Sequence, residues 1–165
     1  MPQCRKGGQF HLPHPTLSET ATFTFMTSEE FEQLVAEEFP NAIPEKFRSI
    51  ISNLAFLVED EPDTETRSAE KLHKNETLLG LYHGVPYPLR GDLYGVGAVL
   101  PDTITLYQKP IEDEARAMEH THKLENVRMT FEECVSTVVR ETIWHEVAHH
   151  FGMDEHTVRR REDER

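Results

Sequence analysis

The amino-acid sequence predicts a single globular domain that combines helices with short strands. The chain has 165 residues, the size of one ordinary domain of roughly 100–200 residues. Leu, Ile, Val and Phe supply 40 of them, which exceeds the roughly 20 % below which highly charged chains stay unfolded. Apolar residues recur at helical spacing in some segments and form short strand-like runs in others. We therefore expect a hydrophobic core with looser ends.

Composition excludes several classes of partner and location. The chain has 17 basic and 30 acidic residues, a formal net charge of −13, and so acidic a surface repels phosphate backbones. No run reaches the roughly 18 apolar residues of a membrane span, and residues 1–15 lack the apolar stretch of a secretory signal. The two cysteines are too few for a disulfide framework. We expect a soluble cytoplasmic protein without nucleic-acid or membrane partners, and the oligomeric state stays open.

The ends of the chain differ in composition from its middle. Residues 1–26 are rich in glycine, proline and polar side chains, which predicts a disordered N-terminal appendage. Cys4, His11 and His14 could bind a metal ion there, but a mobile tail is the expected interpretation. The domain itself is predicted over 27–156. A charged tail that frays is predicted over 157–165.

The first elements are predicted from caps, prolines and spacing. Thr27 and Glu30 form a capping box that starts a helix, which Pro40 closes. Pro44 suits the first turn of a second helix. Its expected apolar side consists of Phe47, Ile50, Ile51 and Leu54. Residues 55–60 predict a short buried strand.

The middle of the chain predicts two strands separated by a long loop. Residues 61–74 are charged and predict a loop with some helix. Residues 78–83 and 103–108 are the strand candidates. Between them, 84–101 contains four glycines and three prolines, which predicts a long, mobile loop. Pro110 then starts another helix.

A second capping box, Thr130 with Glu133, starts what we predict to be the longest helix, over 131–151. Gly152 ends it. At 100° per residue, one sector of this helix is apolar and continues into two histidines. It consists of Phe131, Cys134, Val135, Val138, Thr142, His145 and His149. Because buried imidazoles without partners are costly, this stripe calls for a shared ion or a polar network.

The segment that carries chemistry begins at His145. His145 and His149 are four residues apart, so both imidazoles can reach one ion from the same helix face, and zinc favours such nitrogen ligands. Glu146 is placed to accept a proton from water at that ion. Gly152 lets the chain turn back, so that an acid at position 155 can return to the ion. The pattern therefore predicts zinc ligands at His145, His149 and Glu155, with Glu146 as the general base.

The third zinc ligand is the open part of this prediction. Spacing favours Glu155, and Asp154 is the alternative. A donor from the histidine-bearing segments 11–14 or 120–122 also stays open, although His120 and His122 lie in a polar stretch and are expected to be solvated.

Other residues receive structural interpretations. His150 lies about 100° from His149 around the helix, so we expect it to pack behind the ligands or support them. Cys134 is expected to be a small core residue rather than a nucleophile. Arg90 and Tyr107 flank the long loop and a strand, and either could polarise a substrate carbonyl.

Taken together, these segments resemble the small bacterial minimal-zincin family of zinc metallopeptidases, which have the motif HExxHxxGxx[DE]. The resemblance covers about residues 28–156. It rests on FEQLVAEEFPNAIPEKF, LAFLVEDEP, LLGLYHGVPYPLR, LPDTITLYQKPIE and, above all, VVRETIWHEVAHHFGMDE. It implies an α+β, zincin-like fold in which a short β-sheet packs beside an active-site helix. It also implies zinc bound by the two histidines and an acid after the glycine.

The function predicted from these residues is hydrolysis of peptide bonds by zinc-activated water, with Glu146 as general base. A peptide or protein is the expected substrate, and an exposed strand such as 103–108 could hold it by strand addition. One alternative is a zinc-stabilised module for protein interaction without turnover. Another is a metal-dependent endoribonuclease, against which stand the net charge of −13 and the presence of Glu146.

Overall fold

The computed structural model describes residues 26–91 and 100–163. The predictions for the appendage, with Cys4, His11 and His14, and for the middle of the long loop lie outside the described residues. The helices are α1 (Ser28–Ala42), α2 (Glu45–Arg48), α3 (Thr64–Ala69), the 3-10 turn η1 (Tyr87–Leu89), α4 (Gln108–Leu124), α5 (Phe131–His150) and α6 (Glu155–Asp163). The strands are β1 (Leu54–Glu59), β2 (Gly80–His83) and β3 (Asp102–Tyr107).

The strands form one sheet in the order β1-β3-β2. β1 runs parallel to β3, with Leu54 opposite Asp102, and β2 runs antiparallel to β3, with Tyr82 opposite Ile104. The prediction that segment 103–108 is an exposed strand is therefore wrong. Both of its edges are paired and Ile104 is fully buried, so it has no free edge for an added peptide strand.

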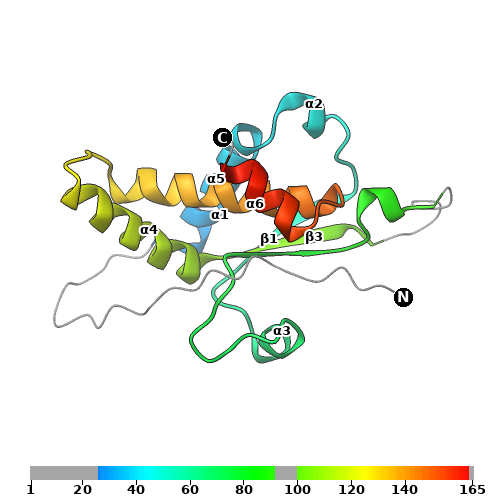
Figure 1. Cartoon of the computed structure of the whole chain (residues 1–165), viewed down its shortest axis with the longest axis horizontal. Coiled ribbons are helices and arrows are strands. Elements are labelled where there is room, and N and C mark those ends of the chain that lie inside the picture. The colour runs from blue at the N-terminus through cyan, green and yellow to red at the C-terminus, as the bar shows by residue number, and fades with distance from the viewer. Residues whose placement is uncertain (1–25, 92–99, 164–165) are drawn as a thin grey trace.

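The helices lie mainly on one side of this sheet (Figure 1). There α5 contacts α1, α4, α6 and both β2 and β3, while α3 lies below the strands in the same view. The core lies between α5 and its neighbours, and its fully buried members include Phe31, Ile104, Ile111, Val139 and Ile143. Among residues 26–91 and 100–163, no helix is both long enough and apolar enough to cross a membrane. The packing of helices against a short three-stranded sheet is the α+β architecture predicted from the sequence.

The two predicted N-terminal helices differ from those observed. α1 continues through Pro40 to Ala42, and the N–H of Ile43 donates to the carbonyl of Phe39 at 3.3 Å. The second helix, predicted to reach Leu54, has only four residues. Asn53 adopts a positive φ of 56°, which a helix cannot accommodate, and the next residue pairs with β3 instead.

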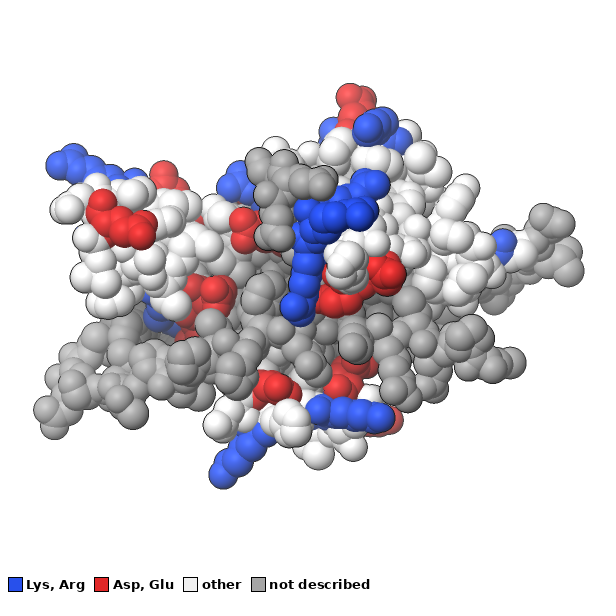
Figure 2. Space-filling model, in the orientation of Figure 1, with Lys and Arg blue, Asp and Glu red and all other residues white. Residues whose placement is uncertain are grey.

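The C-terminal segment is also more ordered than predicted. Residues expected to fray from 157 onward form α6, where Val158 is fully buried. This buried side chain anchors a helix whose other residues are mostly charged. Although the whole chain is acidic, basic side chains gather over α6 on the face drawn in Figure 2. Arg159, Arg160 and Arg161 are the exposed basic residues of that helix.

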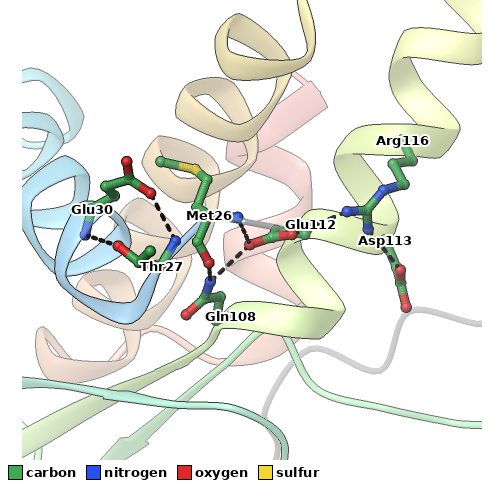
Figure 3. A network of polar contacts seen from close by, with 7 residues as sticks. All are labelled: Met26, Thr27, Glu30, Gln108, Glu112, Asp113 and Arg116. Carbon is green, nitrogen blue, oxygen red and sulfur yellow. Dashed lines mark hydrogen bonds and ion pairs between the residues drawn. The ribbon is translucent and has the colours of Figure 1, made fainter. Parts of the chain in front are cut away.

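Met26 lies at the end of the predicted appendage, but α4 holds its backbone (Figure 3). Its N–H donates to Glu112 Oε1 at 3.2 Å, and its carbonyl accepts from Gln108 Nε2 at 2.7 Å. Glu112 is fully buried and also pairs with Arg116 at 3.1 Å. The capping box of Thr27 and Glu30 then starts α1 as predicted. The limits of the predicted domain, 27–156, stay a prediction.

Candidate active site

The candidate site is built on the C-terminal half of α5. The helix begins at the predicted capping box, in which Thr130 Oγ1 accepts from the N–H of Glu133 and Glu133 Oε2 accepts from the N–H of Thr130. All eight residues from Ile143 to His150 are buried. Polar side chains in such an environment need partners, so the way the structure satisfies them indicates what the site can do.

The chain reverses directly after α5. The N–H of Gly152 donates to the carbonyl of His149 at 2.8 Å, and the N–H of Met153 donates to the carbonyl of Ala148 at 3.0 Å. These two bonds form a Schellman motif, which needs a residue with positive φ after the helix. Gly152 supplies it with a φ of 81°. Because of this reversal, α6 begins at Glu155 beside the last turns of α5.

Three side chains converge at this turn. One ligand atom from each of His145, His149 and Glu155 lies within 4.8 Å of the others. Glu155 Oε2 is 3.3 Å from Nε2 of His145 and 3.5 Å from Nε2 of His149. Two imidazole nitrogens and one carboxylate oxygen are a donor set that catalytic zinc takes in proteins, with a further position kept for water.

The hydrogen bonds behind these side chains suit a metal ion. His149 Nδ1 lies 3.0 Å from the carbonyl oxygen of Met153, and because a carbonyl only accepts, Nδ1 carries the proton. Nε2 of His149 therefore presents its lone pair to the site, the arrangement common in metal-binding histidines. Both this Nε2 and Glu155 Oε2 are buried atoms without a hydrogen-bond partner. The donor set thus fits a zinc ion.

The carboxyl group of Glu155 is held in its ionised form. Burial raises its pKa, but contacts with His145 and His149, when these imidazoles are protonated, and with Arg159 outweigh burial and hold the pKa well below its ordinary value. Arg159 Nε donates to the other oxygen, Oε1, at 2.7 Å. Oε2 is therefore the oxygen that faces the histidines.

Glu146 lies on the same helix and is only 2 % exposed. Its Oε2 accepts a hydrogen bond of 2.9 Å from the backbone N–H of Tyr82 in β2. Burial raises the pKa of Glu146, and the neighbouring His145 and His149 partly offset that effect. A carboxylate whose pKa is raised is a stronger base than an ordinary one, which suits it to accept a proton.

The close approach of β2 to α5 depends on Gly80. A Cβ atom at this position would lie 2.7 Å from Thr142 Cγ2 and 3.0 Å from Glu146 Cγ, so the first contact would clash and the second would be unusually tight. The missing side chain therefore lets the strand lie against the helix where Glu146 projects.

The remaining predicted site residues lie apart from this group. Asp154 is exposed and caps α6, since its Oδ1 accepts from the N–H of Thr157 at 2.8 Å. His120 and His122 lie on α4 and do not join the group. Cys134 is buried in the core, as predicted.

The structure gives His150, Arg90 and Tyr107 structural positions. His150 is fully buried behind the ligands and lies 3.2 Å from Arg90 through its Nδ1. Arg90 pairs with Asp102 rather than standing free for a substrate. Tyr107 is buried at the end of β3. Neither Arg90 nor Tyr107 is thus placed as the predicted carbonyl-polarising group.

The sequence did not indicate that Tyr82 binds Glu146 or that Asp102 is buried and paired with Arg90. The N–H of Tyr82 is a backbone group, so no side-chain pattern could reveal that it binds Glu146. Asp102 directly follows Pro101, the last residue of the predicted loop, and an acid at such a place is usually a turn residue. Only its 3 % exposure shows that it belongs to the interior.

Comparison with known protein families matches residues 51–165 to the zincin-like metallopeptidases. The match covers well over half of the chain, so the protein belongs to the zincin-like metallopeptidase family. It includes the whole sheet, α5 and α6, and it confirms both the predicted family and the predicted fold class. A search of the curated proteins found no match.

Proposed function

We propose that this protein is a zinc-dependent peptidase whose metal is held by His145, His149 and Glu155. The observation that carries the proposal is the convergence of these three donors beside the buried carboxyl group of Glu146. Family membership supports hydrolysis as the class of reaction. The proposed substrate is a peptide or a protein, and the proposed location is the cytoplasm.

In the proposed reaction, Glu146, Tyr82 and Arg159 have different roles. A bound zinc ion supplies a Lewis acid that polarises a carbonyl group and lowers the pKa of water. Glu146 accepts a proton from the attacking water and delivers it to the leaving amine, so one group serves first as base and then as acid. The N–H of Tyr82 holds its carboxyl group in one orientation during both transfers. Arg159 keeps one oxygen of Glu155 occupied and leaves the other for the metal site.

The test combines metal analysis with hydrolysis of unfolded casein and of a peptide library. We expect about one zinc ion per chain, and we expect His145→Ala or His149→Ala to remove it, because too few donors remain. Glu146→Gln is nearly isosteric and should keep zinc and fold while hydrolysis falls by roughly 10²-fold or more. Glu132→Gln, on an exposed position of the same helix, is the matched control and should change nothing.

Each other outcome has a definite meaning. Full zinc retention in both histidine variants would remove the metal assignment. If wild type and Glu146→Gln bind zinc and hydrolyse peptides equally well, Glu146 is not the general base. If the wild-type protein binds zinc but hydrolyses no peptide, a zinc-stabilised interaction module is favoured. A parallel assay on RNA tests the endoribonuclease alternative.

A further inference from the structure

A second group of buried polar side chains lies next to the candidate site and is not used by the proposed reaction. It consists of Tyr82, Arg90, Asp102 and His150, which we call the Asp102 cluster. The side chain of Asp102 is 3 % exposed and that of Arg90 is 9 % exposed, while His150 is fully buried. A buried acid and a buried guanidinium are costly unless each is paired, so the arrangement of this cluster needs a reason.

Asp102 lies at the centre of the cluster. Its Oδ2 accepts from the hydroxyl of Tyr82 at 2.7 Å and pairs with the guanidinium of Arg90. The same guanidinium lies 3.2 Å from His150 Nδ1, and this nitrogen also lies 3.3 Å from Asp102 Oδ2. The rings of Tyr82 and His150 are nearly perpendicular, with their centroids 5.6 Å apart.

Tyr82 joins this cluster to the active site. Its hydroxyl is bound by Asp102, and its backbone N–H is bound by Glu146. The direction of that N–H follows from the sheet. The N–H of Tyr107 donates to Leu79, and in antiparallel strands the paired residues alternate, so the N–H of Tyr82 points away from β3 and toward α5.

The cluster also fixes the surroundings of the metal site. Arg90 Nε donates to the carbonyl of Val85 at 2.9 Å, which closes the segment around η1. Pro88 of that segment lies against Gly152, where an added Cβ would come within 2.8 Å of its ring. His150 is the last residue of α5 and directly follows His149. One buried acid thus ties together β2, β3, the end of α5 and the turn before Glu155.

We propose that Asp102 is a positioning residue that holds Tyr82, and through its N–H the carboxyl group of Glu146, in the orientation for proton transfer. The inference rests on the proposed function in that Glu146 is taken as the base. A charged pair in the interior is strongly directional, so it fixes the strand more firmly than apolar packing would. Loss of the Asp102 carboxylate removes a buried counter-charge of Arg90 and the acceptor of the Tyr82 hydroxyl, so we expect the orientation of Tyr82 to change.

The test uses Asp102→Asn and Tyr82→Phe in the full chain. Tyr82→Phe removes one hydroxyl, keeps the ring on His150 and therefore remains informative if Asp102→Asn does not fold. We expect the backbone amide of Tyr82 to exchange with solvent at least ~10-fold faster in the variants than in wild type, because its hydrogen bond to Glu146 is no longer held in place. The amides that pair β1 with β3 serve as the internal reference. For peptide hydrolysis we expect kcat to fall roughly 10-fold or more with KM within about twofold. For Tyr82→Phe, zinc affinity should stay within about threefold of wild type, since every ligand and the contacts of His150 with Arg90 and Asp102 are kept.

Glu112→Gln is the matched control, because it breaks another buried ion pair, with Arg116, on α4 (Figure 3). It should lower thermal stability without selective exchange at Tyr82 and without a loss of kcat. Unchanged Tyr82 exchange in both test variants would overturn the proposal, as would an equal effect of Glu112→Gln. If the wild-type protein hydrolyses no peptide, the proposed function fails, while amide exchange still decides whether Asp102 holds Tyr82.

Discussion

Two acids follow one another after Gly152, and the structure gives them different partners. Asp154 caps α6, and its hydrogen bonds to Thr157 lower the pKa of its carboxyl group. Glu155 turns inward to the two histidines. The extra methylene of glutamate therefore matters less than position, since the cap residue is already committed to the backbone of the next turn.

This difference predicts how the two acids respond to substitution. Glu155→Ala should weaken zinc binding by roughly 10²-fold or more, because a ligand is lost. Asp154→Ala should cost about 1 kcal/mol of stability through the lost cap and leave zinc affinity within a few-fold of wild type. Competition against a chelator of known affinity measures the first effect and thermal denaturation the second. The reverse ranking of zinc affinities would make Asp154 the ligand.

Among the elements, those with local signals were predictable from the sequence. The capping boxes at Thr27 and Thr130 lie in the sequence itself, and both start helices where predicted. The His145, His149 and Glu155 group also follows from spacing on one helix and one turn, and the structure brings the three together. These features depend on residues within about ten positions of each other.

Elements set by distant contacts were not predictable in the same way. The alternation of segment 103–108 is the same for a central and an edge strand, so its pairing on both sides could not be read from it. The short α2 results from the pairing of Leu54 with Asp102, far along the chain. The order of α6 depends on a single buried Val158 among charged residues. Tertiary contact decides each of these cases.

The turn between α5 and α6 requires glycine at position 152. Gly152→Ala places a side chain at a φ of 81° and against Pro88, so we expect a loss of about 1–3 kcal/mol. For a chain of this size that corresponds to a fall in Tm of roughly 2–12 °C. Zinc affinity should fall as well, because the turn places Glu155.

Gly91→Ala is the control, since an added Cβ there meets no atom of residues 26–91 and 100–163 within 4 Å. It should leave Tm and zinc affinity unchanged. Differential scanning calorimetry and chelator competition compare the two variants. Equal Tm values for Gly152→Ala and wild type would show that the turn relaxes at no cost.

At the scale of the whole molecule, the charged side chains are not evenly distributed over the surface. The chain carries −13 overall, yet basic side chains lie over α6, the helix that begins with Glu155 (Figure 2). Net charge thus describes the average surface and not the surface beside the site. The surface over α6 should therefore repel a polyanion less than the average surface does, and a parallel assay of RNA and peptide hydrolysis tests whether RNA is cleaved.

The stability of the whole fold should depend on Tyr107 at alkaline pH. Burial and then the charge of Glu59 raise the pKa of Tyr107 to about 12, from an unfolded value of about 10. A raised pKa stabilises the folded state fully below the unfolded value, and that contribution is lost as pH rises through the folded value. The free energy of unfolding should therefore fall between about pH 10 and pH 12.

Tyr107→Phe isolates this contribution. Urea denaturation at several pH values should show a shallower alkaline decline in the variant than in wild type, because phenylalanine does not ionise. Tyr82 also has a raised pKa and is present in both proteins, so it cancels in the comparison. Identical slopes would show that Tyr107 is not responsible.

The short turn at Gly152 also bears on how far each part of the site depends on the rest of the fold. The proposed metal donors lie on adjoining stretches of chain, from His145 to Glu155, so bringing them together closes only a small loop and costs little entropy. The bond between Tyr82 and Glu146, in contrast, spans 64 positions and forms only when the sheet docks on α5. The proposed metal donors therefore depend mainly on local structure, whereas the bond that orients Glu146 depends on the packing of β2 against α5. The proposed hydrolysis should therefore be more sensitive to loosening of the sheet than zinc binding is.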